Sequence, residues 1–439
     1  MSSNEIDRER HSPPLRNGAR LALVVSRFPL IDETFILREM LVLDGAGYEF
    51  EIYTMKKPDD RVVHAEAQPL IPRRVYRNYL WSRELWRTNW RFLRRRPARY
   101  VGAVTMILKE TVRKPLSMLK SILLFPKAVC YADLMVRANL THIHAFWATF
   151  PATIAWIAHR LTGIPYSFSA HAHDIYEDDF MLATKLRESS FVMTCTAINY
   201  KHLTALVPVK AAAIRLIRHG LDLQPFLNDA QHHETDNNIF RILSIGTLYK
   251  TKGFDTLIEA CALLQRQGIP FECRLVGDGP ERQRLQRLIA AQGLEDRVSL
   301  LGYLTREQLR PLRRWADVFV LLPRPYLHWG LPNVYIEALA ARLAVVATPL
   351  NAVAELIEHE KTGLVVESDN PTAAAAALLR LYREPILRDR LAAAGQKRVP
   401  GMFDAAKSAQ LIIKLFDEFI EPSRATSGSQ TARSAMLHP

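Results

Sequence analysis

Short apolar runs alternate with longer amphipathic stretches along the second half of the chain. The expected strands are RILSIG, FECRLVG, VSLLG, VFVLLP, AVVAT and GLVVE. The expected helices between and after them cover 254–266, 281–292, 306–315, 334–341, 353–359 and 372–382. Strands that are apolar throughout are buried on both faces, and helices of this length between them imply parallel crossovers. The second half is therefore predicted to be a doubly wound parallel sheet.

The first half follows a similar but less regular alternation. Its strand candidates are LALVVS, EFEIYT, HIHAFW, YSFSAH, FVMTCT and AIRLIR. We predict two Rossmann-like domains that face each other across a cleft, with ligands at the carboxyl ends of the strands. The expected segments are a tail over 1–18, a first domain over 19–223, a polar linker over 224–238, a second domain over 239–422 with a closing helix, and a tail over 423–439.

The positive charge of the chain is concentrated in one insertion of the first domain. The chain has 58 Lys and Arg against 45 Asp and Glu, a net charge of +13. Between Arg73 and Lys120, fourteen basic residues face two acidic ones, so this segment alone carries +12. One local basic face is indicated, rather than a surface that coats nucleic acid. No recognised nucleic-acid module is present, and we predict no nucleic-acid partner.

Aromatic residues interleave with the arginines of this insertion. Such a pattern is expected of an interfacial helix on an anionic membrane. The alternative is a solvated helix with its aromatics in the core, because Trp86 and Trp90 share one helix face in either case.

The sequence predicts a cytoplasmic protein at the inner face of the membrane. Residues up to Arg20 lack the apolar core of a signal peptide. The uncharged stretch Ala138 to His159 is interrupted by polar residues and divided by Pro151, which favours a strand and a buried helix over a membrane span. Four cysteines without a Cys-x-x-Cys pair fit a reducing compartment and indicate neither a zinc site nor a disulfide framework.

A loop after VFVLLP leads into a predicted helix and is a candidate anion site. Gly330 lets a ligand approach the backbone, Pro332 suits the first helical turn, and the amide groups there favour a diphosphate. Glu337 lies about one turn further on, where its carboxylate could accept both hydroxyls of a ribose. An ordinary helix start with an acid favoured by the helix dipole explains the pattern equally well.

The first loop of the second half holds Lys250 and Lys252, which could neutralise phosphate charge. Solvated loop lysines are common, so this loop does not decide the function alone. The segment Gly277-Asp-Gly-Pro280 looks like a dinucleotide fingerprint but lacks the third glycine, and Pro and Glu stand where a pyrophosphate would lie. We predict a turn at this position.

His171 and His173 follow the strand YSFSA, and Asp174 comes next. A period of two would place both histidines on one face, where they could bind a metal. A third ligand cluster at a recognisable spacing is missing. We therefore predict no metal site, and a histidine at the strand end that contacts a polar ligand.

Together these motifs resemble the family-4 class of retaining glycosyltransferases, which have the two-domain GT-B fold. The matching segments of the second half are Gly246…Lys252-Gly253-Phe254-Asp255, Leu275-Val-Gly-Asp-Gly-Pro280, Leu301-Gly302, Gly330-Leu-Pro-Asn-Val-Tyr-Ile-Glu337 and Glu355-Leu-Ile…Thr362-Gly363. In the first half, Ser26-Arg-Phe-Pro29, Glu33-Thr-Phe-Ile-Leu-Arg-Glu39 and Phe168-Ser-Ala-His171-Ala-His-Asp174 are similar to the branch that builds bacterial exopolysaccharide, colanic-acid-type and lipopolysaccharide chains.

The resemblance implies a nucleotide-diphosphate sugar held mainly by the second domain, and a lipid-linked or glycan acceptor held mainly by the first. It implies transfer with retained configuration and no required metal or other cofactor. The implied catalytic residues are His171, Lys252 and Glu337, with Glu337 on the donor ribose, Lys252 on the diphosphate and His171 along the transferred sugar. The implied donor-binding residues are Gly246, Lys252, Gly277, Leu301, Gly330, Leu331, Pro332, Asn333, Val334 and Glu337. The implied acceptor-side residues are Glu33, Thr34, His173 and Asp174.

Three positions depart from the family's pattern. Thr247 replaces the arginine of the diphosphate-binding pair, Trp329 replaces an acid that contacts the sugar, and Asn351-Ala352 replaces a Gly-Gly pair. Lys250 or Arg324 could substitute for the missing arginine. An altered donor and a catalytically impaired relative that binds nucleotide or glycan both stay open. A metal-dependent hydrolase using His171, His173 and Asp174 is a further alternative.

Overall fold

A computed structural model describes residues 18–29, 33–58, 65–77, 82–229, 239–325, 331–350 and 352–420. The predicted tails lie outside these residues, apart from Gly18. The chain divides into two compact units, which we describe one at a time. Unit 1 comprises Met1–Thr194, His202–Ile217 and Ala409–Pro439, and unit 2 comprises Cys195–Lys201 and Arg218–Ser408.

Seven parallel strands form the sheet of unit 1, in the order β3-β2-β1-β4-β5-β6-β7. Their bounds are β1 Arg20–Val25, β2 Glu49–Thr54, β3 Arg74–Val75, β4 His142–Phe146, β5 Tyr166–Ala170, β6 Val192–Thr194 and β7 Ile214–Leu216. The six predicted strands are confirmed, whereas the two-residue β3 is too short to leave a pattern. The strand order reverses between β1 and β4, so a ligand crevice is expected at the loops that follow these two strands.

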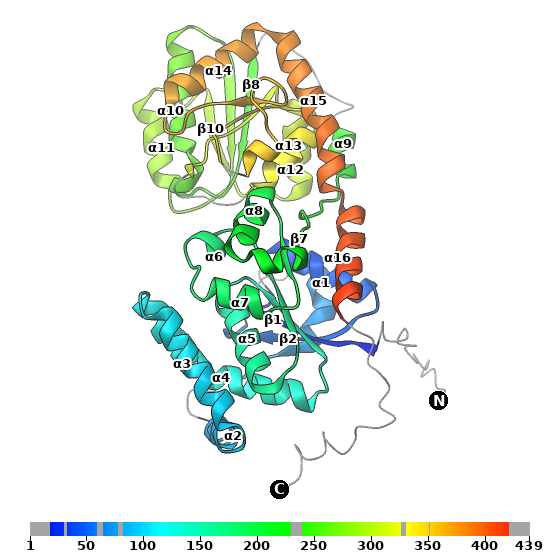
Figure 1. Ribbon diagram of the computed structural model, residues 1–439. Helices are drawn as coiled ribbons and strands as arrows, with labels where there is room; N and C mark the ends of the chain where they lie inside the picture. The colour runs from blue at the N-terminus through cyan, green and yellow to red at the C-terminus, as the bar shows by residue number, and fades with distance from the viewer. Residues whose placement is uncertain are drawn as a thin grey trace, which may run out of the picture. The chain divides into compact units, whose positions relative to one another are not determined.

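Helices cover both faces of this sheet (Figure 1). One face carries α1 (Thr34–Gly45) and α16 (Ala405–Phe419), and the other carries α5 (Phe150–Thr162) and α7 (Leu182–Glu188). Shorter elements are η2 (Ala65–Arg73), α6 (His173–Tyr176), α8 (Ala197–Leu206) and η3 (Pro208–Ala213). The predicted strand followed by a buried helix over 138–159 is confirmed by β4 and α5. Among the described helices, none is long and apolar enough to cross a membrane.

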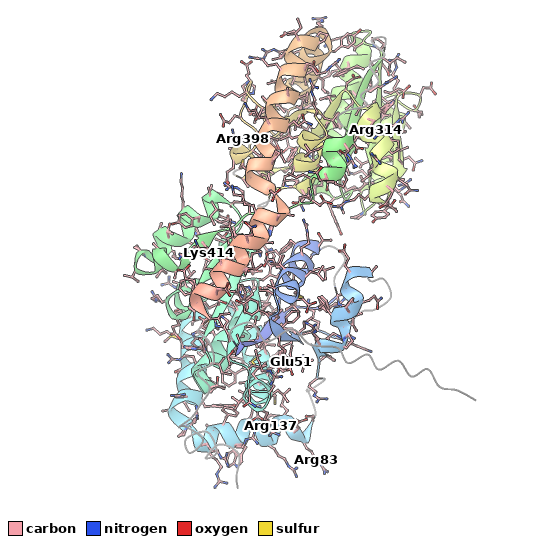
Figure 2. The ribbon with its side chains drawn as sticks, turned by 90° about the vertical axis from the view of Figure 1, so that its right-hand side faces the viewer. Glu51, Arg83, Arg137, Arg314, Arg398 and Lys414 are labelled. Atoms are coloured by element: carbon pink, nitrogen blue, oxygen red, sulfur yellow. The ribbon has the colours of Figure 1, made fainter. Side chains whose placement is uncertain are left out.

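The basic insertion forms three helices between β3 and β4. They are α2 (Arg83–Arg95), α3 (Pro97–Thr111) and α4 (Pro115–Arg137), with Arg83 starting α2 and Arg137 ending α4 (Figure 2). Trp86 and Trp90 are 63% and 60% exposed, whereas the buried side of α2 carries Leu85, Thr88 and Asn89. A helix with its aromatics in the core is therefore wrong for α2.

Six parallel strands form the sheet of unit 2, in the order β10-β9-β8-β11-β12-β13. Their bounds are β8 Phe240–Ile245, β9 Phe271–Val276, β10 Val298–Gly302, β11 Val318–Leu321, β12 Ala344–Ala347 and β13 Leu364–Val365. All six follow the predicted runs, so both doubly wound sheets are confirmed. The order reverses between β8 and β11.

The helices of unit 2 also cover both faces of its sheet (Figure 1). One face carries α10 (Phe254–Arg266), α11 (Arg282–Ala291) and α14 (Pro371–Arg383), and the other carries α12 (Arg306–Trp315), α13 (Asn333–Ala340) and α15 (Pro385–Phe403). Shorter elements are η5 (Lys250–Lys252) and η7 (Val353–Glu355). A helix predicted over 353–359 is wrong beyond η7, because the chain turns there into a bridge between His359 and Gly363.

The unit boundaries differ from the predicted domains at several places: unit 2 includes Cys195–Lys201 and begins again at Arg218, and unit 1 includes Ala409–Pro439. The predicted linker 224–238 begins with a helix, α9 (Gln224–Asp229), whose Phe226 is fully buried in the core of unit 2. Two apolar residues among polar neighbours form a weak pattern, so the helix was missed. The closing helix, α16, contributes Leu415 and Phe416 to the core of unit 1, where they join residues of α1.

Candidate functional site

In unit 2, the loops after β8 and β11 lie against each other at the switch point of the sheet. The backbone N–H of Arg324 donates to the carbonyl of Thr251. Gly253 has a φ of +68°, and a Cβ at this position would lie 1.9 Å from the carbonyl oxygen of Leu322. The close approach therefore requires glycine, and it sets the position of both loops.

Lys252 and Arg324 lie in these two loops but have different surroundings. Lys252 is half-buried, and this burial lowers the pKa of its ammonium group. Arg324 is buried between two carboxylates, with contacts of 3.0 Å to Asp255 and 2.7 Å to Asp369. Its charge is thus neutralised within the protein, and it binds the loops together. Lys252, with the exposed Lys250, presents the positive charge that an anion would meet.

Asp255 completes this arrangement at the start of α10. Burial alone raises the pKa of its carboxyl group, but the hydrogen bonds and charges of Arg284 and Arg324 outweigh that effect and hold the pKa below its usual range. Asp255 is therefore ionised at neutral pH and fixes Arg324 in place.

The turn predicted around Gly277 is confirmed and packs beneath the β8 loop. Gly277 has a φ of +139°, and a Cβ there would lie 1.9 Å from the carbonyl oxygen of Gly246. Leu248 donates its backbone N–H to the carbonyl of Asp278. Two predicted donor-site residues, Gly246 and Gly277, are thus in direct contact. Leu301 lies near the end of β10 and is 38% exposed.

Helix α13 begins directly after Pro332, close to the predicted start. The hydroxyl of Tyr335 donates to the carbonyl of Leu321 at 2.6 Å, which ties the first turn of the helix to the end of β11. Glu337 lies in the second turn and is half-buried. Leu331 and Val334 pack against the core of unit 2, and Asn333 is exposed. The predicted residues Gly330, Trp329 and Asn351 lie outside the described part of the chain.

In unit 1, the loops after β1 and β4 meet through Glu33 and Trp147. The indole Nε1 of Trp147 donates to the carboxylate of Glu33 at 3.0 Å. Trp147 has a φ of +85°, and its ring packs edge-on against Phe35 with 5.7 Å between centroids. Thr34 begins α1, and its hydroxyl accepts a hydrogen bond from Arg38. The predicted acceptor-side residues Glu33 and Thr34 are thus placed at the switch point of the first sheet.

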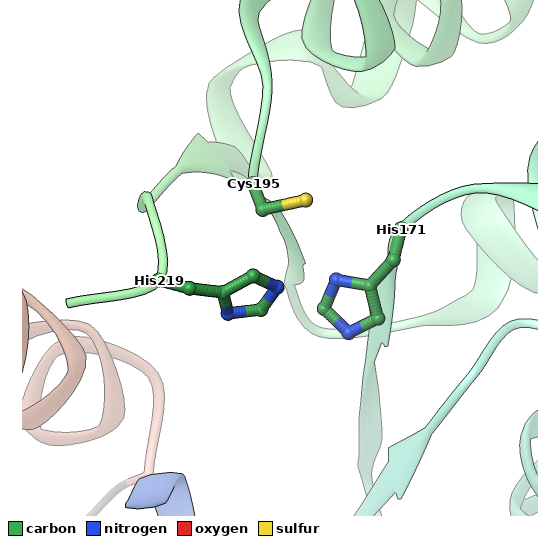
Figure 3. Close-up of side chains that lie close together, drawn as sticks. All are labelled: His171, Cys195 and His219. Carbon is green, nitrogen blue, oxygen red and sulfur yellow. The ribbon is translucent and has the colours of Figure 1, made fainter. Parts of the chain in front are cut away.

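His171 directly follows β5, and its ring projects from the end of that strand (Figure 3). The ring is buried and lies 4.9 Å from Phe35 and 5.1 Å from Trp147, centroid to centroid. Cys195 and His219, which Figure 3 also labels, belong to unit 2. The His171 ring is thus enclosed by the aromatic side chains of Phe35 and Trp147 at the end of β5.

His173 does not share a strand face with His171, contrary to the sequence-based expectation. The strand ends at Ala170 and His173 begins α6, so a period of two does not apply. The His173 ring instead lies 4.7 Å from Trp147, which therefore contacts both histidine rings. Trp147 was predicted to lie in a strand and was missed as a site residue. Its place after a central strand was the available signal.

Asp174 is fully buried and binds backbone rather than facing solvent. Its carboxylate accepts from the N–H groups of Ala148 at 2.8 Å, Ala172 at 2.8 Å and His171 at 3.0 Å. Burial raises the pKa of this carboxyl group, although the backbone N–H groups and the charge of His173 oppose the shift. Asp174 therefore holds the loops after β4 and β5 in one arrangement.

Lys185 also holds the loop after β4, a role that was not predicted. Its ammonium group is fully buried and donates to the carbonyls of Ala148 at 2.6 Å and Thr149 at 3.2 Å. Burial lowers the pKa of Lys185 to about 7, with Asp174 opposing the shift. A single lysine in an amphipathic helix carries no sequence signal of such a role.

Most of unit 2 matches a known protein family. Residues 226–398 match the family described as "Glycosyl transferases group 1". These residues form a group 1 glycosyltransferase domain. The same stretch contains the predicted donor-binding residues of unit 2.

Two of the similar proteins are named for the biosynthesis of bacterial polysaccharides. The chain is 34% identical over 188 residues to the amylovoran biosynthesis glycosyltransferase AmsK of Erwinia amylovora, a match that covers 42% of this chain and 45% of AmsK. It is 25% identical over 390 residues to the putative colanic acid biosynthesis glycosyltransferase WcaL of Salmonella typhimurium, covering 83% of this chain and 91% of WcaL. The chain thus aligns with less than half of AmsK and with most of WcaL.

A solved structure with the same fold is that of Anabaena Alr3699/HepE in complex with UDP and glucose. It aligns with a TM-score of 0.61 at 17% identity and covers 91% of this chain and 100% of that one. The two parallel-sheet units therefore have the GT-B fold, as predicted.

Proposed function

We propose that the protein transfers a sugar from a nucleotide-diphosphate sugar to a lipid-linked or polysaccharide acceptor during the synthesis of bacterial cell-surface polysaccharide. The observation that carries this proposal is the arrangement at the switch point of unit 2, within the group 1 domain. There the Lys252 loop and the N-terminus of α13 lie at neighbouring strand ends.

The donor would be held by charge and by backbone N–H groups. The ammonium of Lys252, already partly desolvated, would pair with the diphosphate and regain its usual pKa when that anion binds. The first amide groups of α13 lack helical partners and would bind phosphate or sugar oxygens. Glu337, one turn further on, would accept the hydroxyls of the ribose. HepE, which has the same fold, was solved in complex with UDP and glucose, and this supports a nucleotide as part of the donor.

The reaction would break the bond between the anomeric carbon and the diphosphate oxygen, and would form a bond from that carbon to an acceptor hydroxyl oxygen on the same face. The electron pair of the broken bond leaves with the nucleoside diphosphate. The hydroxyl proton passes to this leaving group or to solvent. Because negative charge develops on the diphosphate, Lys252 and the α13 amides would supply much of the stabilisation, without a required metal.

The acceptor side would be formed by the rings and the carboxylate of unit 1. The His171 ring is enclosed by Phe35 and Trp147, and Glu33 is oriented by the indole N–H of Trp147. These groups would contact sugar hydroxyls. Asp174 would act through the loops that it holds, because its carboxylate is occupied by three backbone N–H groups. The same occupancy argues against the alternative of a hydrolase that uses Asp174 as a metal ligand.

Turnover of a panel of nucleotide sugars with bacterial lipid extract tests this proposal. We expect nucleoside diphosphate release with one donor, and an NMR spectrum of the new linkage that shows the donor's anomeric configuration. Lys252→Ala is expected to lower kcat/KM by about a hundredfold or more, since it removes charge stabilisation of the leaving group. Lys361→Ala removes an equal charge from an exposed position of unit 2 and should leave turnover unchanged. Inversion of configuration, or equal losses in both variants, would contradict the proposal.

The second candidate function is that of a catalytically impaired relative that binds nucleotide or glycan. Thr247 stands where the family has an arginine, and Arg324 does not take over the role of that arginine. Its guanidinium is neutralised by Asp255 and Asp369. This candidate predicts saturable binding of a nucleotide sugar without turnover on any lipid or glycan extract. Turnover that depends on Lys252 would exclude it.

We further propose that the protein works on the inner face of the cytoplasmic membrane, bound through the basic insertion. Large apolar side chains are exposed along α3, along α4 and in the turn between them. The set, between 39% and 65% exposed, is Val101, Leu108, Val112, Leu116, Leu119, Ile122 and Leu123. On α2, Trp86 and Trp90 alternate with Arg83, Arg87 and Arg94 on the exposed side. Apolar and indole groups flanked by arginines fit the interface of an anionic bilayer.

Sedimentation with vesicles of phosphatidylglycerol and phosphatidylcholine tests this location. The double variant Leu116→Ser with Leu119→Ser is expected to reduce vesicle binding strongly, because it removes apolar contact and leaves the charge unchanged. Ile386→Ser is the matched control, since Ile386 is 87% exposed but lies in unit 2. Equal vesicle binding by the double variant and the wild type would overturn the membrane proposal and leave the donor site untouched.

A further inference from the structure

An open pocket lies in unit 1 between the ends of α2, α4 and α5, away from the loops described above. Its lining is strongly basic on one side and apolar on the other. The residues that form it are Arg91, Phe92, Arg95, Arg96, Asp133, Val136, Arg137, Leu161 and Thr162. Four guanidinium groups thus share the pocket with one carboxylate.

The single carboxylate orients two of these arginines. Asp133 pairs with Arg91 through one oxygen and with Arg137 through the other, the latter at 2.9 Å. Arg96 is held from a third direction, because its guanidinium donates to the carbonyl of Leu161 at 2.8 Å. The guanidinium groups of Arg91, Arg96 and Arg137 are therefore held by contacts within the protein, without a ligand.

The electrostatic balance of the pocket favours an anion. Burial lowers the pKa of Arg96, and the charge of the neighbouring Arg99 lowers it further. Asp133 balances one of the four positive charges in the lining. An oxyanion with two or more negative oxygens would accept several charge-assisted hydrogen bonds from planar guanidinium groups at once.

The apolar side of the pocket restricts the kind of anion. Phe92, Val136 and Leu161 line it, and a bare inorganic ion would leave this surface without contact. A phosphate group carried on an apolar body would use both sides. We propose that this pocket binds the phosphate monoester or diester of an amphipathic molecule, with the arginines on the phosphate and Phe92, Val136 and Leu161 on the adjacent apolar part.

This inference goes beyond the proposed transfer reaction and does not depend on it. The pocket lies between the insertion that we propose to contact the membrane and the end of α5, so a lipid headgroup is one source of such a phosphate. A soluble phosphate ester is the other. Binding is measured with no nucleotide sugar present, so that failure here leaves the transfer reaction untouched.

Titration calorimetry of the full chain with monomeric dihexanoyl phosphatidic acid, and separately with inorganic phosphate, tests the proposal. We expect saturable 1:1 binding of the short-chain lipid. The double variant Arg95→Gln with Arg137→Gln should weaken it by about tenfold or more, since two charge-assisted hydrogen-bonding groups are lost. Arg383→Gln with Arg390→Gln is the matched control: it removes the same charge from exposed positions of unit 2 outside the pocket lining.

The possible outcomes distinguish specific binding in the pocket from non-specific attraction to the basic surface. Weaker binding in the pocket variant alone supports the proposal, and stronger binding of the lipid than of inorganic phosphate assigns a lipid source. Equal binding of the lipid and of inorganic phosphate would overturn the proposal, because the apolar side of the pocket would then contribute nothing to binding. Equal losses in the two double variants, or no saturable binding by the wild type, would overturn the proposal. Circular dichroism of both variants shows that they are folded.

Discussion

The central strands of the two sheets bury different kinds of side chain. In unit 2, β11 and β12 read VFVL and AVVA, and all eight residues are buried. In unit 1, the corresponding β4 and β5 bury His142, His144, Ser167 and Ser169 with no exposed surface. The Ser167 hydroxyl lies 2.8 Å from a ring nitrogen of each histidine, and the second His144 nitrogen lies 3.0 Å from the Ser169 hydroxyl.

The hydrogen-bonded set of His142, His144, Ser167 and Ser169, which we call the polar ladder, lies directly before the proposed acceptor site. Strand β4 leads into Trp147 and β5 into His171, the two rings of the proposed acceptor site. A hydrogen-bonded ladder directly before these residues fixes the register of the two strands, whereas apolar contacts alone leave more freedom. The comparison teaches that unit 2 follows the ordinary rule of apolar burial, while unit 1 departs from it where a site must be held.

The first prediction concerns Asp229, a buried carboxylate of unit 2 that lies outside the sheet. Asp229 is 2% exposed and contacts Arg310 at 2.7 Å and Arg313 at 3.0 Å. Asp229→Ala should lower the free energy of unfolding by about 3 to 5 kcal/mol, because Arg313 stays buried without its partner. Urea unfolding with hydrogen exchange of unit 2 measures this. The control Asp296→Ala, at an exposed position, should have no measurable effect.

The pH dependence should distinguish the two units. Burial lowers the pKa of His142 and of His144 to about 3 in the folded chain. The unfolded chain binds more protons between pH 6.5 and 3, so unit 1 loses stability as the pH falls through this window. At pH 5 the loss is about 4 kcal/mol for the pair. Hydrogen exchange should show faster opening of β4 and β5 than of β11 and β12. A loss confined to unit 2 would contradict the comparison.

In unit 2, close backbone contact holds the loops of the site in place, as the polar ladder holds the strands of the site in unit 1. Gly253→Ala should destabilise unit 2 by about 2 to 4 kcal/mol, because positive φ strain adds to the 1.9 Å approach to Leu322. Gly268 has a similar φ of +72° but nothing within 4 Å of a Cβ. Gly268→Ala should therefore cost only about 1 kcal/mol. Thermal unfolding of both variants checks the difference, and equal shifts in Tm would refute it.

The smallest effect is expected from a matched pair of buried strand serines. Ser167→Ala removes the shared partner of both histidines and should cost about 1 to 3 kcal/mol. Ser244 of β8 is equally buried, but its hydroxyl has no hydrogen-bond partner within the described chain. Ser244→Ala should leave the free energy of unfolding within about 0.5 kcal/mol of wild type. Denaturant midpoints give both values, and a larger loss in Ser244→Ala would contradict the expected difference.

The sheets and the donor loops could be predicted from sequence because their signals are local. Apolar runs mark buried parallel strands, and Gly253 or Pro332 marks a loop or helix start next to them. Lys185 could not be predicted as a site residue, and Trp147 was missed although its place after a central strand was a signal. Their roles depend on which strands become neighbours, and single-residue chemistry does not contain that information. The start of the predicted linker was wrong for the same reason, since Phe226 is an anchor only once the core of unit 2 exists.

The roles given to Glu337, Lys252 and His171 stay predictions, because they require a bound donor. Equilibrium binding of a panel of nucleotide sugars and nucleoside diphosphates to the full chain tests the proposed donor site most directly. We predict saturable 1:1 binding of one nucleotide class, weakened by Lys252→Ala and by Glu337→Ala but not by Lys361→Ala. Absence of binding by any member of the panel to the wild-type chain would contradict this prediction.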